Sequence, residues 1–263
     1  MNHLKIALIL TLFSSTFFAA CKKDDDNGGN SENACKVSNV QYFDSGQVIE
    51  TGTYTYTGNQ VSKIQFNDYN FTFEYTGNNV SKRNYFFSAG SSPEAYDQIS
   101  YNSDNTVSKI ETFSKSNTSS TYSSVYRLDF VYTGGKLSKV RYLDVTGGAS
   151  DLLVENTYTY TGNNITSLSY VDYTDTTQGT INYTYDTNPN LFKKQNSQTY
   201  QIDFFFNPLL FDSQGSLLPM AFSENNVTKL ENTQIDYVSD DKKNLKDLKI
   251  GGVVLASYSY SCQ

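Results

Sequence analysis

Apolar and polar residues alternate with a period of two over most of the chain. In the segment Tyr54-Thr55-Tyr56 two rings flank a threonine, and further on Ile64 and Phe66 flank a glutamine. A period of two places alternate side chains on opposite faces of an extended strand. The pattern therefore predicts β-strands with aromatic and aliphatic groups on one face and Thr, Lys, Gln or Glu on the other.

Short Gly-Asn or Asn-Asn pairs separate these runs, as at Gly58-Asn59. Such residues suit a two-residue chain reversal, so each pair predicts a β-hairpin. The same phrase recurs with drift in six clear copies, which begin at Tyr54, Phe73, Ile99, Phe130, Tyr158 and Phe222. One hairpin written many times predicts an all-β, antiparallel up-and-down meander of about 16 strands.

A flat meander of this size would leave two open edges and an unburied aromatic face. Twist and curling remove both problems, so we expect a closed barrel or a strongly curled sheet with its rings on the dry side. A transmembrane barrel is disfavoured, because many strands are short and the faces carry Thr, Lys, Asp and Asn generously. We expect one β-repeat domain over residues 36–263.

An apolar insert at 197–221 breaks the repeat and contains Pro208 and Pro219, which limit regular strand pairing. One interpretation is a plug that covers one end of the rolled sheet. The other is an apolar lid over a ligand cavity, or a partner-binding patch. The candidate lid residues are Phe204, Phe206, Leu210 and Phe211.

Residues 1–20 have a basic start, a short apolar run and small residues before Cys21, which is typical of a secretory signal peptide. Residues 21–35 follow, rich in Asp, Asn and Gly, and predict a flexible acidic tether. Removal of the signal would take away His3 and Lys5, which leaves 19 basic against 27 acidic residues, a net charge of −8, and no histidine.

The segment Phe18-Ala19-Ala20-Cys21 resembles a bacterial lipobox. The resemblance implies that the thiol of Cys21 is acylated and that lipid holds the protein to the outer membrane. The following Cys-Lys-Lys-Asp-Asp-Asp resembles the export signal of surface lipoproteins in the Bacteroidota, which implies display on the cell surface. The alternative is ordinary secretion, with Cys21 as an unmodified thiol.

Cys35 and Cys262 lie near opposite ends of the expected domain. In an exported protein two such thiols suggest a disulfide that closes the whole fold, worth on the order of 4 kcal/mol by loop entropy. Two unpaired thiols are the alternative.

The chemistry that the mature chain permits is narrow. Without histidine it has no Ser-His-Asp or Cys-His nucleophile and no His-ligated metal, and two further cysteines are too few for a zinc cluster. We therefore expect no cofactor, no metal site and no enzyme. Net negative charge argues against nucleic acid as a partner, despite a stripe of lysines at Lys63, Lys82, Lys109, Lys139 and Lys229. Asp186 begins a segment that superficially mimics a calcium loop, for which a capped turn is the preferred interpretation.

The phrase Tyr-x-Tyr-x-Gly-Asn-x-Val-x-Lys-Ile resembles the tyrosine-aspartate (YD, Rhs-type) repeats that build β-rich shells. With the lipobox and the acidic tether, it is similar to a family of Bacteroidota lipoproteins of unknown function with a porin-like β fold. The resemblance implies fold and location but no activity. We expect a non-catalytic binding module with a glycan or a partner protein as its ligand. A purely structural envelope component is the alternative, and a carboxylate-dependent glycoside hydrolase is less favoured.

Overall fold

The computed structural model describes residues 35–87, 92–116, 120–194 and 217–262. Its strands are β1 Lys36–Asp44, β2 Gln47–Thr57, β3 Gln60–Gln65, β4 Tyr69–Thr76, β5 Asn79–Phe87, β6 Ala95–Tyr101, β7 Val107–Lys115, β8 Tyr122–Thr133, β9 Lys136–Asp144, β10 Asp151–Thr161, β11 Asn164–Asp172, β12 Gln178–Pro189, β13 Asn225–Leu230, β14 Thr233–Ser239, β15 Leu245–Ile250 and β16 Val253–Ser261. The helical elements are the 3₁₀ turn η1 Thr146–Gly148 and the short helices α2 Leu191–Lys194 and α4 Leu218–Phe222.

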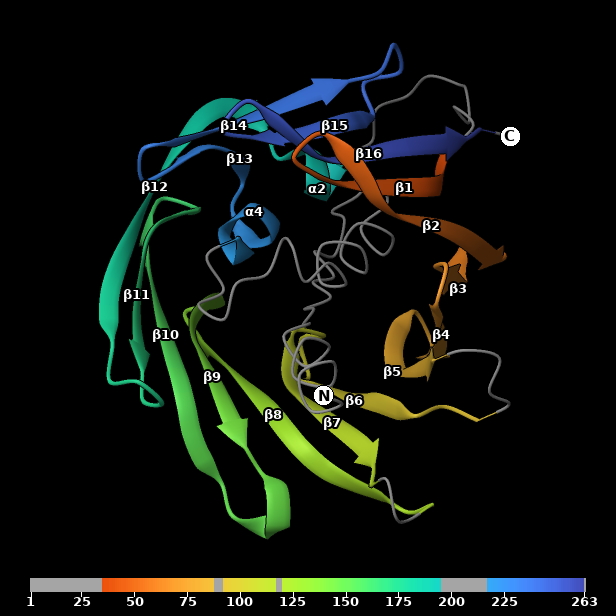
Figure 1. Ribbon diagram of the computed structural model, residues 1–263. Coiled ribbons are helices and arrows are strands. Elements are labelled where there is room, and N and C mark those ends of the chain that lie inside the picture. The colour runs from red at the N-terminus through yellow and green to blue at the C-terminus, as the bar shows by residue number, and fades with distance from the viewer. Residues whose placement is uncertain (1–34, 88–91, 117–119, 195–216, 263) are drawn as a thin grey trace.

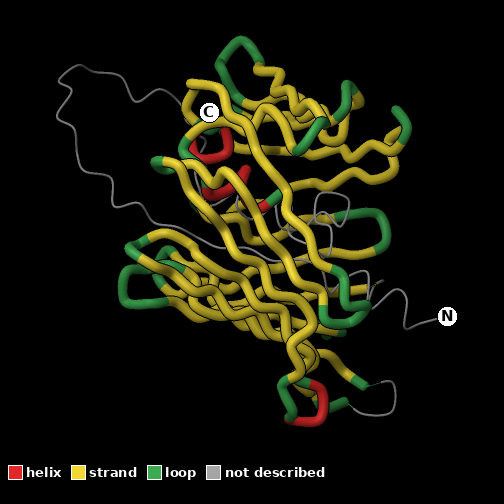
Figure 2. The backbone as a smooth tube through the Cα atoms, turned by 90° about the vertical axis from the view of Figure 1, so that its left-hand side faces the viewer, coloured by secondary structure: helices red, strands yellow, loops and turns green. Residues whose placement is uncertain are grey.

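The 16 strands form one closed antiparallel barrel in which every strand pairs with its neighbours in sequence and β16 pairs with β1. Figure 1 shows the ring of strands around a common centre, with β1 beside β16. Figure 2 shows the wall from the side, with the strands crossing it at a slant. The predicted all-β meander is thus confirmed, and closure of β16 on β1 selects the barrel over the open curled sheet.

The two rims of the barrel are built by different connections. The tight-turn rim carries the repeat turns at 58–59, 77–78, 102–106, 134–135 and 162–163, and Gly58 there has φ 59°. A positive φ costs glycine little, which is why the repeat places glycine at this step. The far rim carries the connections at 45–46, 66–68, 145–150, 173–177, 231–232 and 251–252.

A β-bulge recurs just after each repeat turn. In the β2–β3 hairpin Thr55 lies opposite Lys63 and Tyr56 opposite Val61, so Ser62 is an extra residue. The same shift occurs after the turns that follow β4, β6, β8 and β10. The Ser62 hydroxyl donates a hydrogen bond to the Thr55 carbonyl at 3.1 Å. Because of the extra residue, Val61 and Ile64 both point inward although they are three positions apart.

The inner wall holds a single apolar cluster that draws residues from strands around the whole barrel, from Val37 on β1 to Tyr258 on β16. The rings of the repeat phrase belong to it, among them Tyr54, Phe73 and Phe130, whereas Thr55 is exposed. This agrees with the predicted placement of rings on one face. Burial of this apolar face is the main term that holds the barrel together.

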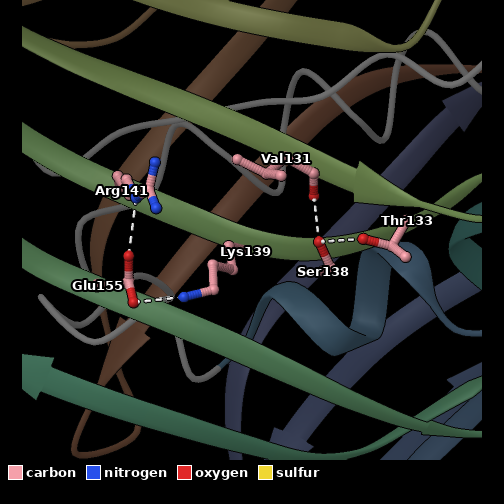
Figure 3. A network of polar contacts seen from close by, with 6 residues as sticks. All are labelled: Val131, Thr133, Ser138, Lys139, Arg141 and Glu155. Carbon is pink, nitrogen blue, oxygen red and sulfur yellow. Dashed lines mark hydrogen bonds and ion pairs between the residues drawn. The ribbon is translucent and has the colours of Figure 1, made fainter.

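The outer wall is polar and carries ion pairs between adjacent strands. Arg141 and Lys139 on β9 bind Glu155 on β10 at 2.8 Å and 2.6 Å (Figure 3). Three members of the predicted lysine stripe are paired with carboxylates, namely Lys82 with Glu74, Lys109 with Glu111 and Lys139 with Glu155. Such compensated surface charges favour a solvated wall over a basic groove.

One aromatic group departs from the expected burial on the inner face. Tyr96 on β6 lies on the face opposite to the buried Asp97, and its ring stacks on Phe113 of β7 with centroids 4.8 Å apart. The Tyr122 ring contacts the Tyr96 ring edge-on, and the Lys82 ammonium lies 4.4 Å from the centroid of the Tyr96 ring. Neighbouring rings and a lysine thus cover part of the aromatic surface that the outer wall would otherwise present to water.

The described end of the apolar insert lies at the tight-turn rim, between β12 and β13. Leu218, Met220 and Phe222 of α4 are buried, and α4 contacts β11, β13 and α2 (Figure 1). Asn190, just after the end of β12, binds the helix α4 and the residue after it. Its amide donates hydrogen bonds to the Met220 carbonyl at 2.6 Å and the Ser223 carbonyl at 2.9 Å.

Candidate ligand cavities at the tight-turn rim

The two ends of the described chain meet at the tight-turn rim. Lys36 of β1 lies opposite Ser261 of β16. The residues just outside them, Cys35 and Cys262, form a disulfide with a Cα–Cα distance of 4.0 Å. The disulfide stands at the place where a turn joins the two strands of the repeat hairpins on this rim, and we call this junction the seam.

A row of tyrosines runs along the tight-turn rim. Each hydroxyl donates a hydrogen bond to a carbonyl at the start of a strand in the neighbouring hairpin, at the first residue of the strand for Leu245 and at the second residue for the others. The pairs are Tyr56 with Val37 at 2.9 Å, Tyr75 with Val61 at 2.9 Å, Tyr101 with Val80 at 2.8 Å, Tyr185 with Ile165, and Tyr260 with Leu245 at 2.6 Å. The bond to Val37 shows that the strand which begins at the seam accepts the same tyrosine hydrogen bond as strands that begin after a turn.

Burial raises the pKa of two tyrosines of this row, and of Tyr160 nearby, above the ordinary value for a phenol. It raises the pKa of Tyr185 to about 12, although the hydrogen bond with the Ser223 hydroxyl acts in the opposite direction. Burial also raises the pKa of Tyr75 and of Tyr160. These hydroxyls therefore stay hydrogen-bond donors.

A cavity of about 560 Å³ opens beside the seam and is called the seam cavity. It is lined by Lys36, Val37, Ser38, Tyr54, Tyr56, Gly58, Asn59 and Ser261. The Lys36 ammonium donates a hydrogen bond to the Gly58 carbonyl at 2.7 Å and lies 5.3 Å from the centroid of the Tyr56 ring. The cavity therefore joins one cation, two phenol rings and several small polar groups.

A second cavity, of about 410 Å³, lies in the wall among β12, β13, β14 and the connection that leads to β15, and is called the β12–β15 cavity. It is lined by Asp186, Asn188, Pro189, Leu191, Asn226, Thr228, Gln234, Ile235, Asp236, Tyr237, Ser239 and Lys243. β13 and β14 pair only at Lys229 with Gln234 and Leu230 with Thr233, next to their connecting turn. Beyond these pairs the strands separate, and the separation makes room for the cavity.

Hydrogen bonds fix the polar side chains of the β12–β15 cavity. The Asp186 carboxylate accepts from the backbone N–H of Asn188 at 2.9 Å, from its amide at 2.7 Å and from the Asn226 amide at 3.2 Å. The Gln234 amide donates to Asp236 at 3.1 Å. Asp186 thus caps its own turn, as the preferred interpretation of this segment holds.

A buried ion pair lies on the inner wall of β5–β7. Asp97 accepts hydrogen bonds from Arg83 at 2.7 Å and from the Tyr85 hydroxyl through one oxygen, and from Thr112 at 2.7 Å through the other. Arg83 also lies over the Tyr85 ring, 4.7 Å from its centroid. Because both oxygens of Asp97 are engaged by donors, this carboxylate is built for packing and not for proton transfer.

Sequence reasoning missed this pair, although the repeat contains its signal. Arg83 occupies the position that holds Ile64, Ile110 and Val140 in other copies of the phrase. A charged side chain on the buried face needs an opposite charge beside it, because burial of an unpaired charge is costly. Asp97 supplies that charge, since it lies directly opposite Arg83 on β6.

The cavities arise from strands that the sequence did not single out as site elements. Among the predicted site residues, Cys35 and Cys262 form the disulfide. They are the chain neighbours of Lys36 and Ser261, which line the seam cavity. Cys21 and the candidate lid residues Phe204, Phe206, Leu210 and Phe211 lie outside the described residues.

Within the described ranges, no three His, Cys, Asp or Glu side chains gather closely enough to hold a metal ion. In the same residues, no helix has both the length and the apolar character needed to cross a membrane.

No protein-family model and no curated protein matches the chain. The fold is similar to a porin-like protein from Bacteroides uniformis, at 12% identity and a TM-score of 0.50, over 86% of this chain and 96% of that one. A porin-like protein from Bacteroides vulgatus matches at 11% identity and a TM-score of 0.48, over 86% and 98%. A DUF3836 family protein from the same species matches at 11% identity and a TM-score of 0.30, over 33% and 91%. At these identities the likeness to the Bacteroides uniformis protein extends to the barrel fold alone.

Proposed function

We propose that the chain is a lipoprotein of the bacterial outer membrane, anchored through Cys21 and displayed on the cell surface, whose barrel is a non-catalytic binding module. The lipobox-like end of the signal sequence and the acidic tether support the anchor. The polar outer wall supports a barrel that stands in water beside the membrane. A lipid-facing wall needs an apolar band, whereas this wall carries Arg141, Lys139 and Glu155.

The ligand that best fits the β12–β15 cavity is a glycan. Carboxylates and amides, among them Asp186, Asn226, Gln234 and Asp236, supply paired acceptors and donors of the kind that bind sugar hydroxyls. The buried Ile235 and the half-buried Tyr237 supply apolar surface for the ring carbons. The observation that carries the proposal is this set of polar groups, held by hydrogen bonds over apolar residues in a cavity where β13 and β14 separate.

A binding assay on the mature protein with Cys21→Ser, which removes the acyl site and leaves the barrel intact, tests this function. We expect the protein to bind one or more glycans of a broad array, and Asp236→Asn or Gln234→Ala to weaken the best binder at least tenfold. Asp129→Asn on the outer wall, where Asp129 pairs with Arg127, is the matched control and should leave the affinity unchanged.

Two outcomes would contradict the proposal. Failure of every glycan to bind would favour the structural envelope component. Release of reducing sugar that is lost in Asp186→Asn would favour the hydrolase, since Asp186 and Asp236 line one cavity. Anchoring is tested separately, because mass spectrometry of the wild-type protein should find acyl chains on residue 21, and the Cys21→Ser protein should leave the membrane fraction.

A further inference from the structure

Tyr54 lines the seam cavity, and its hydroxyl is a buried polar group that the described part of the fold leaves without a hydrogen bond. Tyr54 is only 7% exposed, and within the described part of the chain its hydroxyl has no hydrogen-bond partner. The equivalent position of the repeat holds Phe73 and Phe130, so the barrel needs the ring here and not the hydroxyl. A buried, unpaired phenol is costly unless a ligand completes it.

The Lys36 ammonium supplies an uncompensated positive charge at the same cavity. Outer-wall lysines such as Lys109 and Lys139 bind carboxylates, whereas Lys36 has no carboxylate partner among the described residues. Its hydrogen bond is to a neutral carbonyl, that of Gly58. In a chain with more acidic than basic residues, a lone cation beside a free hydroxyl indicates a site for an anion.

We propose that the seam cavity binds a sugar that carries a carboxylate, a uronic acid. The Lys36 ammonium and the Tyr54 hydroxyl donate to the carboxylate. The Tyr56 ring contacts the apolar face of the sugar, and Ser38 and Asn59 contact its hydroxyls. The proposal extends the glycan-binding function to a second cavity, and it does not depend on the β12–β15 cavity.

The chain offers a matched control for Lys36. The Lys136 ammonium also donates to a turn glycine carbonyl, that of Gly162, and also lies 5.3 Å from a tyrosine centroid, that of Tyr160. Lys136 therefore repeats the structural contacts of Lys36 on another hairpin, but it does not line the seam cavity. Any effect specific to Lys36→Met reports the cavity and not the hairpin.

Titration calorimetry of the Cys21→Ser protein with galacturonate oligomers, and with galactose oligomers of equal length, tests the inference. We expect the acidic oligomer to bind and the neutral one to bind at least tenfold more weakly at this site. Lys36→Met should weaken the acidic ligand at least tenfold, and Lys136→Met should leave it unchanged. Added salt should weaken binding, since the contact is ionic.

Tyr54→Phe separates ligand binding from folding. We expect it to weaken the acidic oligomer about tenfold or more, as expected for one lost hydrogen bond to a charged group, with an unchanged or higher unfolding midpoint. Tyr56→Phe should instead lower that midpoint, because its hydroxyl binds the Val37 carbonyl.

Equal losses in Lys36→Met and Lys136→Met would overturn the proposal, as would absence of acidic-oligomer binding by the parent protein. Preference for a sugar phosphate over the uronate would overturn the choice of carboxylate. Loss of neutral-glycan binding in Asp236→Asn alone would concern only the β12–β15 cavity.

Discussion

Side-chain hydroxyl groups of tyrosine and serine form hydrogen bonds with backbone carbonyls, both between neighbouring hairpins and within one hairpin. The row tyrosines reach across to a neighbouring carbonyl, as Tyr75 does to Val61. The bulge serines reach across their own hairpin, as Ser138 does to the Val131 carbonyl at 3.0 Å (Figure 3). These bonds satisfy backbone acceptors where a rim or a bulge interrupts the ladder.

The tyrosine row makes the barrel sensitive to alkali. The pKa of Tyr185 is about 12 in the folded protein and near 10 when unfolded, so folding favours the protonated phenol. This contribution to stability is complete below pH 10 and is lost as the pH rises toward 12. We expect the unfolding midpoint in urea to fall over that range, and less steeply in Tyr185→Phe. A Tyr185 that ionises near pH 10 in the folded protein, seen as a tyrosinate difference spectrum between the two proteins, would contradict this account.

At the scale of the strand, the inner wall tolerates charge only where partners complete it. Arg83 on β5 and Asp97 on β6 are 3% and 1% exposed, and Tyr85 and Thr112 occupy the remaining acceptor sites. The outer-wall pairs, such as Arg127 with Asp129, lie in contact with water, where an ion pair contributes little.

Removal of one member of the buried pair should be costly. We expect Arg83→Met to lower the free energy of unfolding by about 3–5 kcal/mol, because Asp97 would remain charged in an apolar wall. Adding Asp97→Asn should recover part of the loss, since the stranded charge is then gone. Arg127→Met should cost at most about 1 kcal/mol. Chemical unfolding of the four proteins measures this, and equal losses for Arg83→Met and Arg127→Met would refute the argument.

The strands could be predicted because their signals are local. The Gly-Asn pair sets the turn, and the alternation in Tyr54-Thr55-Tyr56 sets the face. The bulge could not be read in this way, because its extra Ser62 looks like one more polar outward residue. The two cavities also could not be predicted from the sequence. One needs β1 beside β16, which are far apart in sequence, and the other needs β13 and β14 to separate after two pairs.

At the scale of the molecule, the seam sets where the N-terminal segment joins the barrel. Cys35, the last residue of the expected tether, lies at the tight-turn rim. An anchor at Cys21, as proposed above, would be attached to the barrel at that rim and not at the far rim. All four of the large, exposed apolar side chains found among the described residues, Val48, Ile49, Tyr173 and Val253, lie on strands or connections at the far rim.

The disulfide should contribute strongly to stability, because it links residues 227 positions apart. We expect Cys35→Ser with Cys262→Ser to lower the free energy of unfolding by about 5 kcal/mol, on a loop-entropy estimate. Urea unfolding of the variant, and of the parent protein with and without reductant, measures the effect. Reduction should reproduce the variant, and an unchanged midpoint in both would show that β1–β16 pairing alone holds the seam.

The seam also implies that the hairpins keep one cyclic order in which the starting point of the chain can be moved. With Cys35 and Cys262 only 4.0 Å apart between Cα atoms, the polypeptide is nearly a continuous loop of hairpins. A circular permutant that joins the strands β16 and β1 by a Gly-Asn linker and opens the chain at Gly134-Gly135 should assemble the same barrel. Its new ends would then leave the wall between β8 and β9, on the opposite side of the barrel from the seam, which offers a way to attach an anchor there.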